Sequence, residues 1–209
     1  MNKKNIFVVI GIILIICLIF GINALINNKK DKKETNVELL SGKYYVEMTI
    51  KDYGKIIVEL DADAAPITVT NFVNLVNNKF YDGLTFHRII NGFMIQGGAS
   101  DKEVKMPTIK GEFSANGIEN NILHKRGVIS MARVDGNYDS ASTQFFIMHK
   151  DYPSLDGQYA AFGHVVEGID VVDKIAKVES IPDTNGIVED SKQPVIETMI
   201  LIDYDKEVE

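Results

Sequence analysis

The sequence of 209 residues contains no tryptophan and a single cysteine, Cys17. One cysteine cannot form a disulfide within the chain, so the fold can form in either redox compartment. The histidines are also sparse, and none lies within five residues of another or of the cysteine; they are His87, His124, His149 and His164. Protein zinc sites draw several Cys or His ligands from short spacings, and this sequence therefore predicts no metal site.

Motifs that bind phosphate or activate a nucleophile are missing as well. The chain has neither a G-x-S-x-G segment nor a G-x-x-x-x-G-K-[ST] segment. The glycines at 92, 97 and 98 do not follow the G-x-G-x-x-G spacing of a dinucleotide loop. We therefore expect a protein that works without a nucleotide or any other cofactor.

Basic residues are in the minority, since 22 Lys and Arg face 29 Asp and Glu for a net charge of −7. Residues 1–34 nevertheless carry six Lys and two acidic residues, a net charge of +4, so the remaining residues together carry −11. An acidic domain repels a phosphate backbone, and we therefore expect no nucleic-acid partner.

Long apolar runs are absent except near the N-terminus. Residues 6–22 are uncharged and apolar, and with the residues that follow they approach the roughly 20 that span a bilayer. A signal peptide usually has a shorter apolar region of about 7–15 residues, followed by a small-residue cleavage site that this sequence lacks. We therefore predict that residues 1–28 form a transmembrane anchor, with a cleaved signal segment as the alternative.

Residues 29–41 are polar and rich in lysine, and they are interpreted as a linker. Lysines flank the apolar run on both sides, and the positive-inside tendency alone would keep the richer C-terminal flank in the cytoplasm. A single N-terminal span with the whole domain after it nevertheless resembles an export signal. We therefore expect a cell-membrane protein whose domain lies outside the cytoplasm, with secretion after cleavage as the alternative.

From residue 42 to residue 206 the sequence is typical of one domain built from short strands. The segments rich in β-branched and aromatic residues are 44–50, 54–60, 84–90, 93–97, 127–133, 143–149, 159–166 and 195–204. Helical spacing of apolar residues appears over 61–78, where Pro66 suits a first turn, and again over 167–178. Many strands with two helices predict a mainly β fold, either a closed barrel or a sandwich.

One charged residue interrupts the apolar segment "FHRIINGFMIQGG", and it is Arg88. Burying a guanidinium without a partner is costly, so we expect Arg88 to have either a hydrogen-bonding partner or a functional role. A three-residue loop over 91–93 would pair Arg88 with Gln96 on one face of a hairpin, beside Met94. A two-residue turn would instead pair Arg88 with Ile95. The three-residue loop gives the guanidinium a neutral neighbour and leaves its charge available to a ligand.

Four motifs carry a resemblance to a known family. "FHRIINGFMIQGG", "GVISMAR", "STQFFI" and "LDGQYAAFGHV" occur in this order between Tyr44 and Tyr204, and together they resemble the cyclophilins, the peptidyl-prolyl cis-trans isomerases. The segment "KGEFSANGIENNILHKRGVISMAR" is similar to bacterial members. The resemblance implies a closed eight-stranded antiparallel β-barrel capped by two α-helices, with a substrate groove on its outer surface.

The resemblance also implies a set of site residues. Arg88 corresponds to the catalytic arginine, and Gln96 to the glutamine that orients it. The implied substrate-binding positions are Phe93, Met94, Ala132, Arg133, Gln144, Phe146, Leu155 and Tyr159. The phenylalanine, methionine and leucine side chains among them would form the walls of a proline pocket, and Arg133 would meet the substrate through its backbone.

Three positions depart from the pattern of animal cyclophilins. Ser154 stands where many members have a tryptophan that contacts cyclosporin, so we expect cyclosporin binding to be weakened. Tyr159 stands where many have histidine, and it can still supply an aromatic wall. Arg133 replaces a common asparagine and is expected to bias substrate choice.

The function implied by the resemblance is isomerisation of X-Pro bonds in proline-containing polypeptides, without a cofactor, in support of protein folding. With the N-terminal segment, the expected clients are exported proteins. The alternative is a tethered module that binds proline-containing segments without significant turnover.

Overall fold

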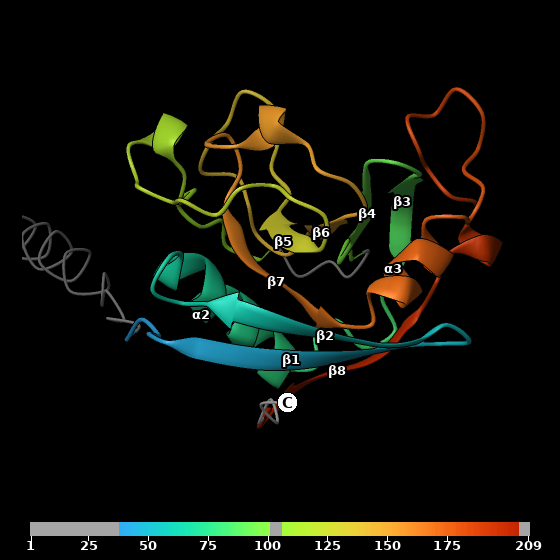
Figure 1. Cartoon of the computed structure of the whole chain (residues 1–209), viewed down its shortest axis with the longest axis horizontal. Coiled ribbons are helices and arrows are strands. Elements are labelled where there is room, and N and C mark those ends of the chain that lie inside the picture. Colours follow the sequence, from blue (N-terminus) through green and yellow to red (C-terminus); the bar gives the residue numbers. More distant parts are fainter. Residues whose placement is uncertain (1–37, 101–105, 205–209) are drawn as a thin grey trace, which may run out of the picture. The chain divides into compact units, whose positions relative to one another are not determined.

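The computed structural model describes residues 38–100 and 106–204 of the chain. Its eight strands pair antiparallel in one sheet and are β1 (Lys43–Ile50), β2 (Gly54–Asp61), β3 (Phe86–Ile90), β4 (Met94–Gly97), β5 (Val128–Met131), β6 (Phe145–Met148), β7 (Ala161–Glu167) and β8 (Ile196–Ile202). Every strand predicted from the sequence overlaps one of them (Figure 1).

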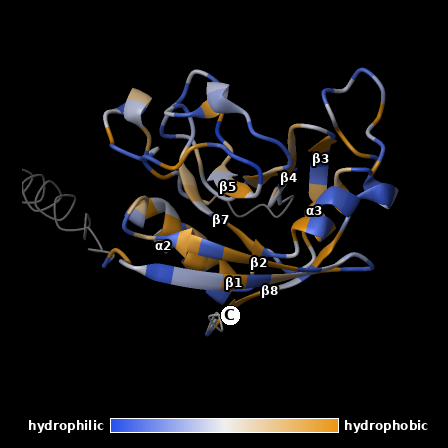
Figure 2. Cartoon of the chain, viewed as in Figure 1, coloured by the Kyte–Doolittle hydropathy of each residue, from blue (hydrophilic) through white to orange (hydrophobic). Residues whose placement is uncertain are grey.

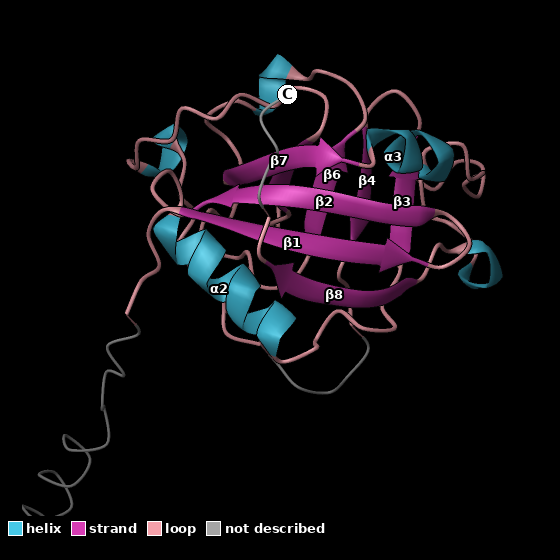
Figure 3. Ribbon diagram, turned by 60° about the horizontal axis from the view of Figure 1, so that its bottom comes forward, coloured by secondary structure: helices cyan, strands magenta, loops and turns pink. Residues whose placement is uncertain are grey.

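The sheet curls on itself, so that β1, β2 and β8 pass across β3, β4 and β6 (Figure 3). Its strand order is β3-β4-β6-β5-β7-β2-β1-β8, which makes β3 and β8 the end strands. Beside them, Thr85 and Val195 form a single isolated bridge, and the Ile196 N–H donates to the Leu84 carbonyl over 2.8 Å. Within the described residues the expected closed barrel is therefore an open, curled sheet whose ends meet at one bridge.

Strand alternation separates a buried face from an outer face. Successive residues of a strand point to opposite sides, and β1 buries Val46, Met48 and Ile50 on one side of the sheet. Hydrophobic residues accordingly follow the strands, whereas hydrophilic residues concentrate in the loops (Figure 2). The domain therefore has one main core on the concave side of the curled sheet.

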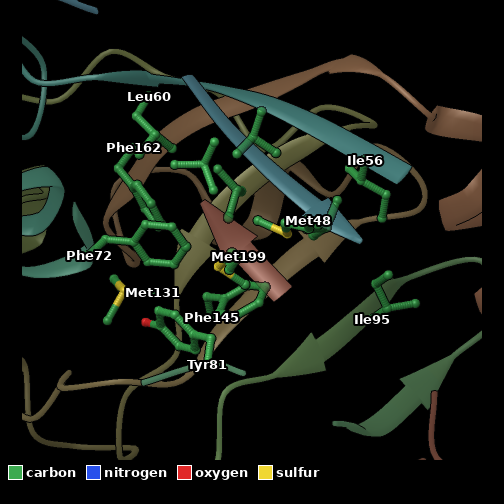
Figure 4. Close-up of a cluster of buried hydrophobic side chains, with 14 of the residues drawn as sticks. Met48, Ile56, Leu60, Phe72, Tyr81, Ile95, Met131, Phe145, Phe162 and Met199 are labelled. Atoms are coloured by element: carbon green, nitrogen blue, oxygen red, sulfur yellow. The ribbon is translucent and has the colours of Figure 1, made fainter. Parts of the chain in front are cut away.

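Aromatic rings fill the centre of this core (Figure 4). The Phe72 ring lies 5.1 Å from the Tyr81 ring and 5.1 Å from the Phe162 ring, measured between centroids. Phe145 meets Phe72 edge-to-face at 5.5 Å. Such offset and edge-to-face arrangements are the ones that ring quadrupoles favour.

Two α-helices lie at opposite ends of the curled sheet (Figures 1 and 3). Helix α2 (Pro66–Asn77) begins with proline in its first turn, as predicted. The buried carboxylate of Glu112 accepts hydrogen bonds from the N–H groups of Ile67 and Thr68 at 2.9 and 2.7 Å, and so satisfies free donors of that turn. Helix α3 (Ile169–Ile175) buries Val171, Val172 and Ile175.

The predicted anchor over 1–28 and most of the predicted linker over 29–41 lie outside the described residues. At the linker's described end, the Leu40 N–H donates to Thr70 Oγ1 over 2.9 Å, and Leu40 packs against the core. Among the described residues, no helix has the length and apolar character needed to cross a membrane.

Candidate active site

The hairpin formed by β3 and β4 has the three-residue loop predicted from the sequence. Arg88 pairs with Gln96 and Ile90 pairs with Met94, which leaves residues 91–93 as the loop. Gly92 at its centre has φ +77°, a left-handed conformation that glycine adopts without strain. The predicted register is therefore confirmed, and Arg88 and Gln96 share one face.

A chain of neutral hydrogen bonds orients Arg88 from the sheet. Its Nη1 donates to Gln96 Oε1 over 3.0 Å and lies 3.8 Å from Met94 Sδ. Gln96 Nε2 in turn donates to Gln144 Oε1 over 2.9 Å. The arginine ion pairs of the described residues involve Arg126 and Arg133, and none involves Arg88. The guanidinium is thus oriented without being neutralised.

A loop far along the chain holds Arg88 from the other side. Arg88 Nε donates to the Asn185 carbonyl over 2.9 Å, and Nη2 donates to Asn185 Oδ1 over 3.2 Å. The Ile89 N–H donates to the Gly186 carbonyl over 2.7 Å, which ties this loop to the edge of β3. A Cβ on Gly186 would lie 2.5 Å from Ile90 Cγ1, so glycine is required for the close approach.

Asn185 was missed by the sequence analysis, although an Asn-Gly pair is a turn signal. It is 97 residues from Arg88, and no periodic pattern links the two positions. Arginine has five N–H donors, and these contacts leave at least one Nη hydrogen of Arg88 without an acceptor among the described residues. Burial lowers the pKa of Arg88, and Tyr159 opposes this shift. An arginine starts from so high a pKa that it stays protonated at neutral pH.

A cavity of about 180 Å³ lies beside the guanidinium. It is lined by Arg88, Phe93, Met94, Gln96, Ala132, Arg133, Phe146, Leu155 and Tyr159, which are nine of the ten predicted site residues. The tenth, Gln144, is not among the lining residues but accepts a hydrogen bond from Gln96, which is one of them. An apolar cavity of about 150 Å³ can hold benzene, so this one has room for a five-membered ring.

The cavity has an apolar cluster of its own, separate from the main core. Met94 and Phe146 are 1% and 5% exposed, and with Val128, Met148 and Ala161 they form this second cluster. Alternation along β6 explains the separation, because Phe145 points into the main core and the next residue points out to the cavity.

A buried histidine supports the cavity floor. The His124 ring stacks on Phe146 with centroids 6.0 Å apart. Its Nε2 lies 3.1 Å from Ser130 Oγ, and its Nδ1 lies 3.1 Å from Asp156 Oδ1. Burial lowers the pKa of His124, and Asp156 opposes the shift. Ser130 is fully buried, so this Ser-His-Asp arrangement presents no nucleophile to a substrate.

The Arg133 side chain is enclosed, with only 7% of it exposed. Its guanidinium carbon lies 4.5, 5.0 and 5.7 Å from the ring centroids of Tyr159, Tyr138 and Phe113, and Nε donates to the Gln158 carbonyl over 3.0 Å. No backbone hydrogen bond of Arg133 is present within the described residues. Its side chain therefore shapes the cavity through Tyr159, and its backbone remains available to a ligand.

Ser154 is exposed in a short 3-10 helix (Pro153–Leu155) and does not line the cavity. The nearby Tyr152 ring packs on Phe93 with centroids 4.5 Å apart. Within residues 38–100 and 106–204, no three His, Cys, Asp or Glu side chains are grouped so that they could hold a metal ion.

Known proteins are similar to this chain in sequence and in fold. A family model described as "Cyclophilin type peptidyl-prolyl cis-trans isomerase/CLD" matches residues 45–200. A peptidyl-prolyl cis-trans isomerase A of Dickeya dadantii is 46% identical over 136 residues, which cover 61% of this chain and 68% of that protein. A peptidyl-prolyl cis-trans isomerase of Acinetobacter baylyi is 43% identical over 148 residues, covering 68% of this chain and 77% of that protein.

A solved structure supports the fold independently. The crystal structure of a Cryptosporidium parvum cyclophilin type peptidyl-prolyl cis-trans isomerase in the presence of the dipeptide Ala-Pro has a TM-score of 0.66 and 24% identity. The match covers 77% of this chain and 99% of that one. By the family model and its relatives, the chain belongs to the cyclophilin-type peptidyl-prolyl cis-trans isomerases and is an enzyme of that kind.

Proposed function

We propose that Arg88 is the group that accelerates X-Pro rotation in this enzyme. The observation that carries the proposal is a guanidinium held by neutral acceptors from two sides, without a carboxylate partner among the described residues, at the edge of a cavity that is partly lined by apolar side chains. Rotation of a peptide bond faces a barrier of about 18–20 kcal/mol because its conjugation must break. The twisted prolyl nitrogen regains a lone pair, and a fixed donor binds that state better than either planar state.

The apolar side chains of the cavity would hold the pyrrolidine ring while the preceding carbonyl swings. Of the apolar side chains that line it, those of Phe146 and Met94 are buried, and those of Phe93 and Leu155 are partly buried. The Ala-Pro dipeptide named for the Cryptosporidium structure has the chemistry that such a cavity would accept. The free backbone of Arg133 would bind the residue before proline.

The test compares Arg88→Ala with wild type in isomerisation of a proline-containing tetrapeptide. We expect kcat/KM to fall by at least about 10²-fold, as for the loss of one transition-state donor. Arg88→Lys is the matched control, because it keeps the charge but cannot reach Gln96 and Asn185 together. Unchanged turnover in Arg88→Ala would overturn the role assigned to Arg88. Binding without exchange between isomers in wild type, measured by NMR, would favour the binding-module alternative.

We further propose that the domain is tethered to the cell membrane and assists the folding of exported proteins. The apolar run over 6–22 and the lysine-rich segment after it support this proposal. Protease added to intact cells should digest the domain while a cytoplasmic marker stays whole. Digestion only after lysis would place the domain in the cytoplasm, and a mature chain lacking residues 1–28 would favour secretion after cleavage.

We also propose that cyclosporin binds weakly, because Ser154 supplies no aromatic surface beside Leu155. Ser154→Trp should lower the inhibitory concentration of cyclosporin by about tenfold, which corresponds to about 1.4 kcal/mol. Equal inhibition of both proteins would mean that this position does not determine the drug's affinity.

A further inference from the structure

The loop that carries Phe93 is held from outside the cavity by His149. The Gly92 N–H donates to His149 Nδ1 over 2.9 Å, and the His149 N–H donates to the Phe93 carbonyl over 2.9 Å. Two consecutive residues of the loop over 91–93 are thus fixed by one residue at the end of β6. His149 does not line the cavity.

The hydrogen bond from Gly92 determines which ring nitrogen of His149 carries the hydrogen. Nδ1 must be unprotonated to accept from Gly92, so Nε2 carries the hydrogen. Nε2 lies 3.2 Å from Asp173 Oδ1 on helix α3, within reach of that acceptor. The orientation of the imidazole is therefore set from both edges of the ring.

Arg126 completes the arrangement. Its Nη1 and Nη2 donate to Asp173 Oδ1 and Oδ2 over 2.7 and 2.8 Å, and Nη1 also donates to the His149 carbonyl over 2.9 Å. Arg126 is the main cause of the lowered pKa of Asp173, so this carboxylate stays ionised at neutral pH. A paired carboxylate with a fixed orientation is a suitable acceptor for the His149 ring.

We propose that His149 is a positioning residue that fixes the Phe93 wall of the proline pocket, with Asp173 and Arg126 holding the ring of His149 in place. The proposal rests on the proposed role of the cavity as the proline pocket. Arg88 is oriented separately, by Gln96 and Asn185, so loss of the Gly92 contact should loosen the wall without disturbing the donor. The effect should therefore appear in KM more than in kcat.

Two substitutions of His149 test its contact with Gly92 and its contact with Asp173 one at a time. In His149→Asn, the side-chain oxygen can occupy the position of Nδ1, so the bond from Gly92 is kept and the contact with Asp173 is lost. In His149→Gln, the terminal amide can occupy the position of Nε2, so the contact with Asp173 is kept and the bond from Gly92 is lost. We expect His149→Gln to raise KM about 3- to 10-fold with kcat changed less than about twofold, as for one lost hydrogen bond. His149→Asn should stay nearer to the wild-type KM.

A double-mutant cycle ties this effect to Phe93. When His149→Gln is added to Phe93→Ala, KM should not rise further, because the wall is already absent. Equal KM in the two His149 variants, a fall in kcat of the same size, or full additivity with Phe93→Ala would each overturn the proposal. Thermal unfolding of each variant shows whether a change in KM comes with loss of the fold.

The chemical shift of the Gly92 amide proton, measured by NMR, tests the hydrogen bond from Gly92 to His149 without any measurement of turnover. It should move to the position of a free N–H in His149→Gln and stay near its wild-type value in His149→Asn. An unchanged shift in His149→Gln would overturn the hydrogen bond itself. This chemical shift does not depend on the role of Arg88. If Arg88→Ala keeps its turnover, the proposed role of Arg88 is overturned, but the hydrogen bond between Gly92 and His149 can still be tested.

Discussion

Phe145 and Phe146 are neighbours on one strand, yet they serve different regions of the molecule. Phe145 is fully buried in the main core, where it meets the rings of Phe72, Tyr81 and Phe86. Phe146 belongs to the outer cluster and faces the cavity, with His124 behind it. The inner face is filled on every side, whereas the outer face leaves one side of its rings open to a ligand. Because side chains alternate along β6, Phe145 stabilises the core and Phe146, the next residue, provides part of the binding surface.

The largest effects are expected when each of the two phenylalanines is truncated to alanine, because the two variants should differ in both stability and KM. Phe145→Ala should lower the free energy of unfolding by about 3–5 kcal/mol, because it leaves a cavity in a closely packed core. Phe146→Ala should lower it less and should raise KM more, since one side of that ring already borders open space. Denaturant unfolding and peptide kinetics on both variants measure these differences. Equal losses of stability would mean that the outer cluster is as closely packed as the core.

A second prediction concerns the polar side of the site. Asn185→Gly keeps the backbone acceptor and the positive φ of +57° but removes Oδ1, and it should lower kcat about 3- to 10-fold. Asn185→Asp keeps the shape but pairs Arg88 with a carboxylate, so we expect a larger fall in kcat. If Asn185→Asp were as active as wild type, an unneutralised guanidinium would not be needed. Steady-state kinetics at constant ionic strength make the comparison.

The pH dependence of stability tests the support behind Phe146. Burial lowers the pKa values of His124 and His87 in the folded protein. The unfolded chain therefore binds protons that the folded chain does not, and stability is fully present above about pH 6.5, the ordinary histidine value. As pH falls below that value, the free energy of unfolding should drop by up to about 1.4 kcal/mol per pH unit for the buried His124 and by less for His87, which solvent screens more.

Urea unfolding between pH 5 and pH 7.5, in wild type and His124→Gln, measures this slope. The variant should lose part of it, because it lacks the imidazole whose pKa burial lowers at position 124. A slope of the opposite sign would show that the folded protein binds the extra protons.

The smallest effect is expected at the enclosed arginine. Arg133→Ala should raise KM about threefold, because Tyr159 loses the cation that packs on its ring at 4.5 Å. Arg133→Lys keeps the charge but loses the planar group, and it should give an intermediate KM. A changed preference for charged residues before proline, with KM otherwise constant, would show instead that the side chain meets the substrate directly.

The parts of the structure that were predictable from the sequence are those set by local rules. The pairing of Arg88 with Gln96 follows from loop length and strand alternation, and the face of α2 follows from helical spacing. Asn185 and the rings of Phe113 and Tyr138 beside Arg133 were not predictable in this way. They reach the site from separate loops, whose paths depend on the whole curled sheet. The closed barrel was expected from the resemblance, and the described residues show an open sheet with a single bridge.

The loop that brings Asn185 to Arg88 has a further consequence for an enzyme that meets unfolded chains. It hydrogen-bonds along β3 through the Gly186 carbonyl and the Val188 N–H, and thereby occupies the backbone groups of an end strand. An uncovered strand edge is a template for adding another extended chain, as in aggregation. Within the described residues, this segment therefore covers the edge of β3 on which an extended chain could otherwise add as an extra strand.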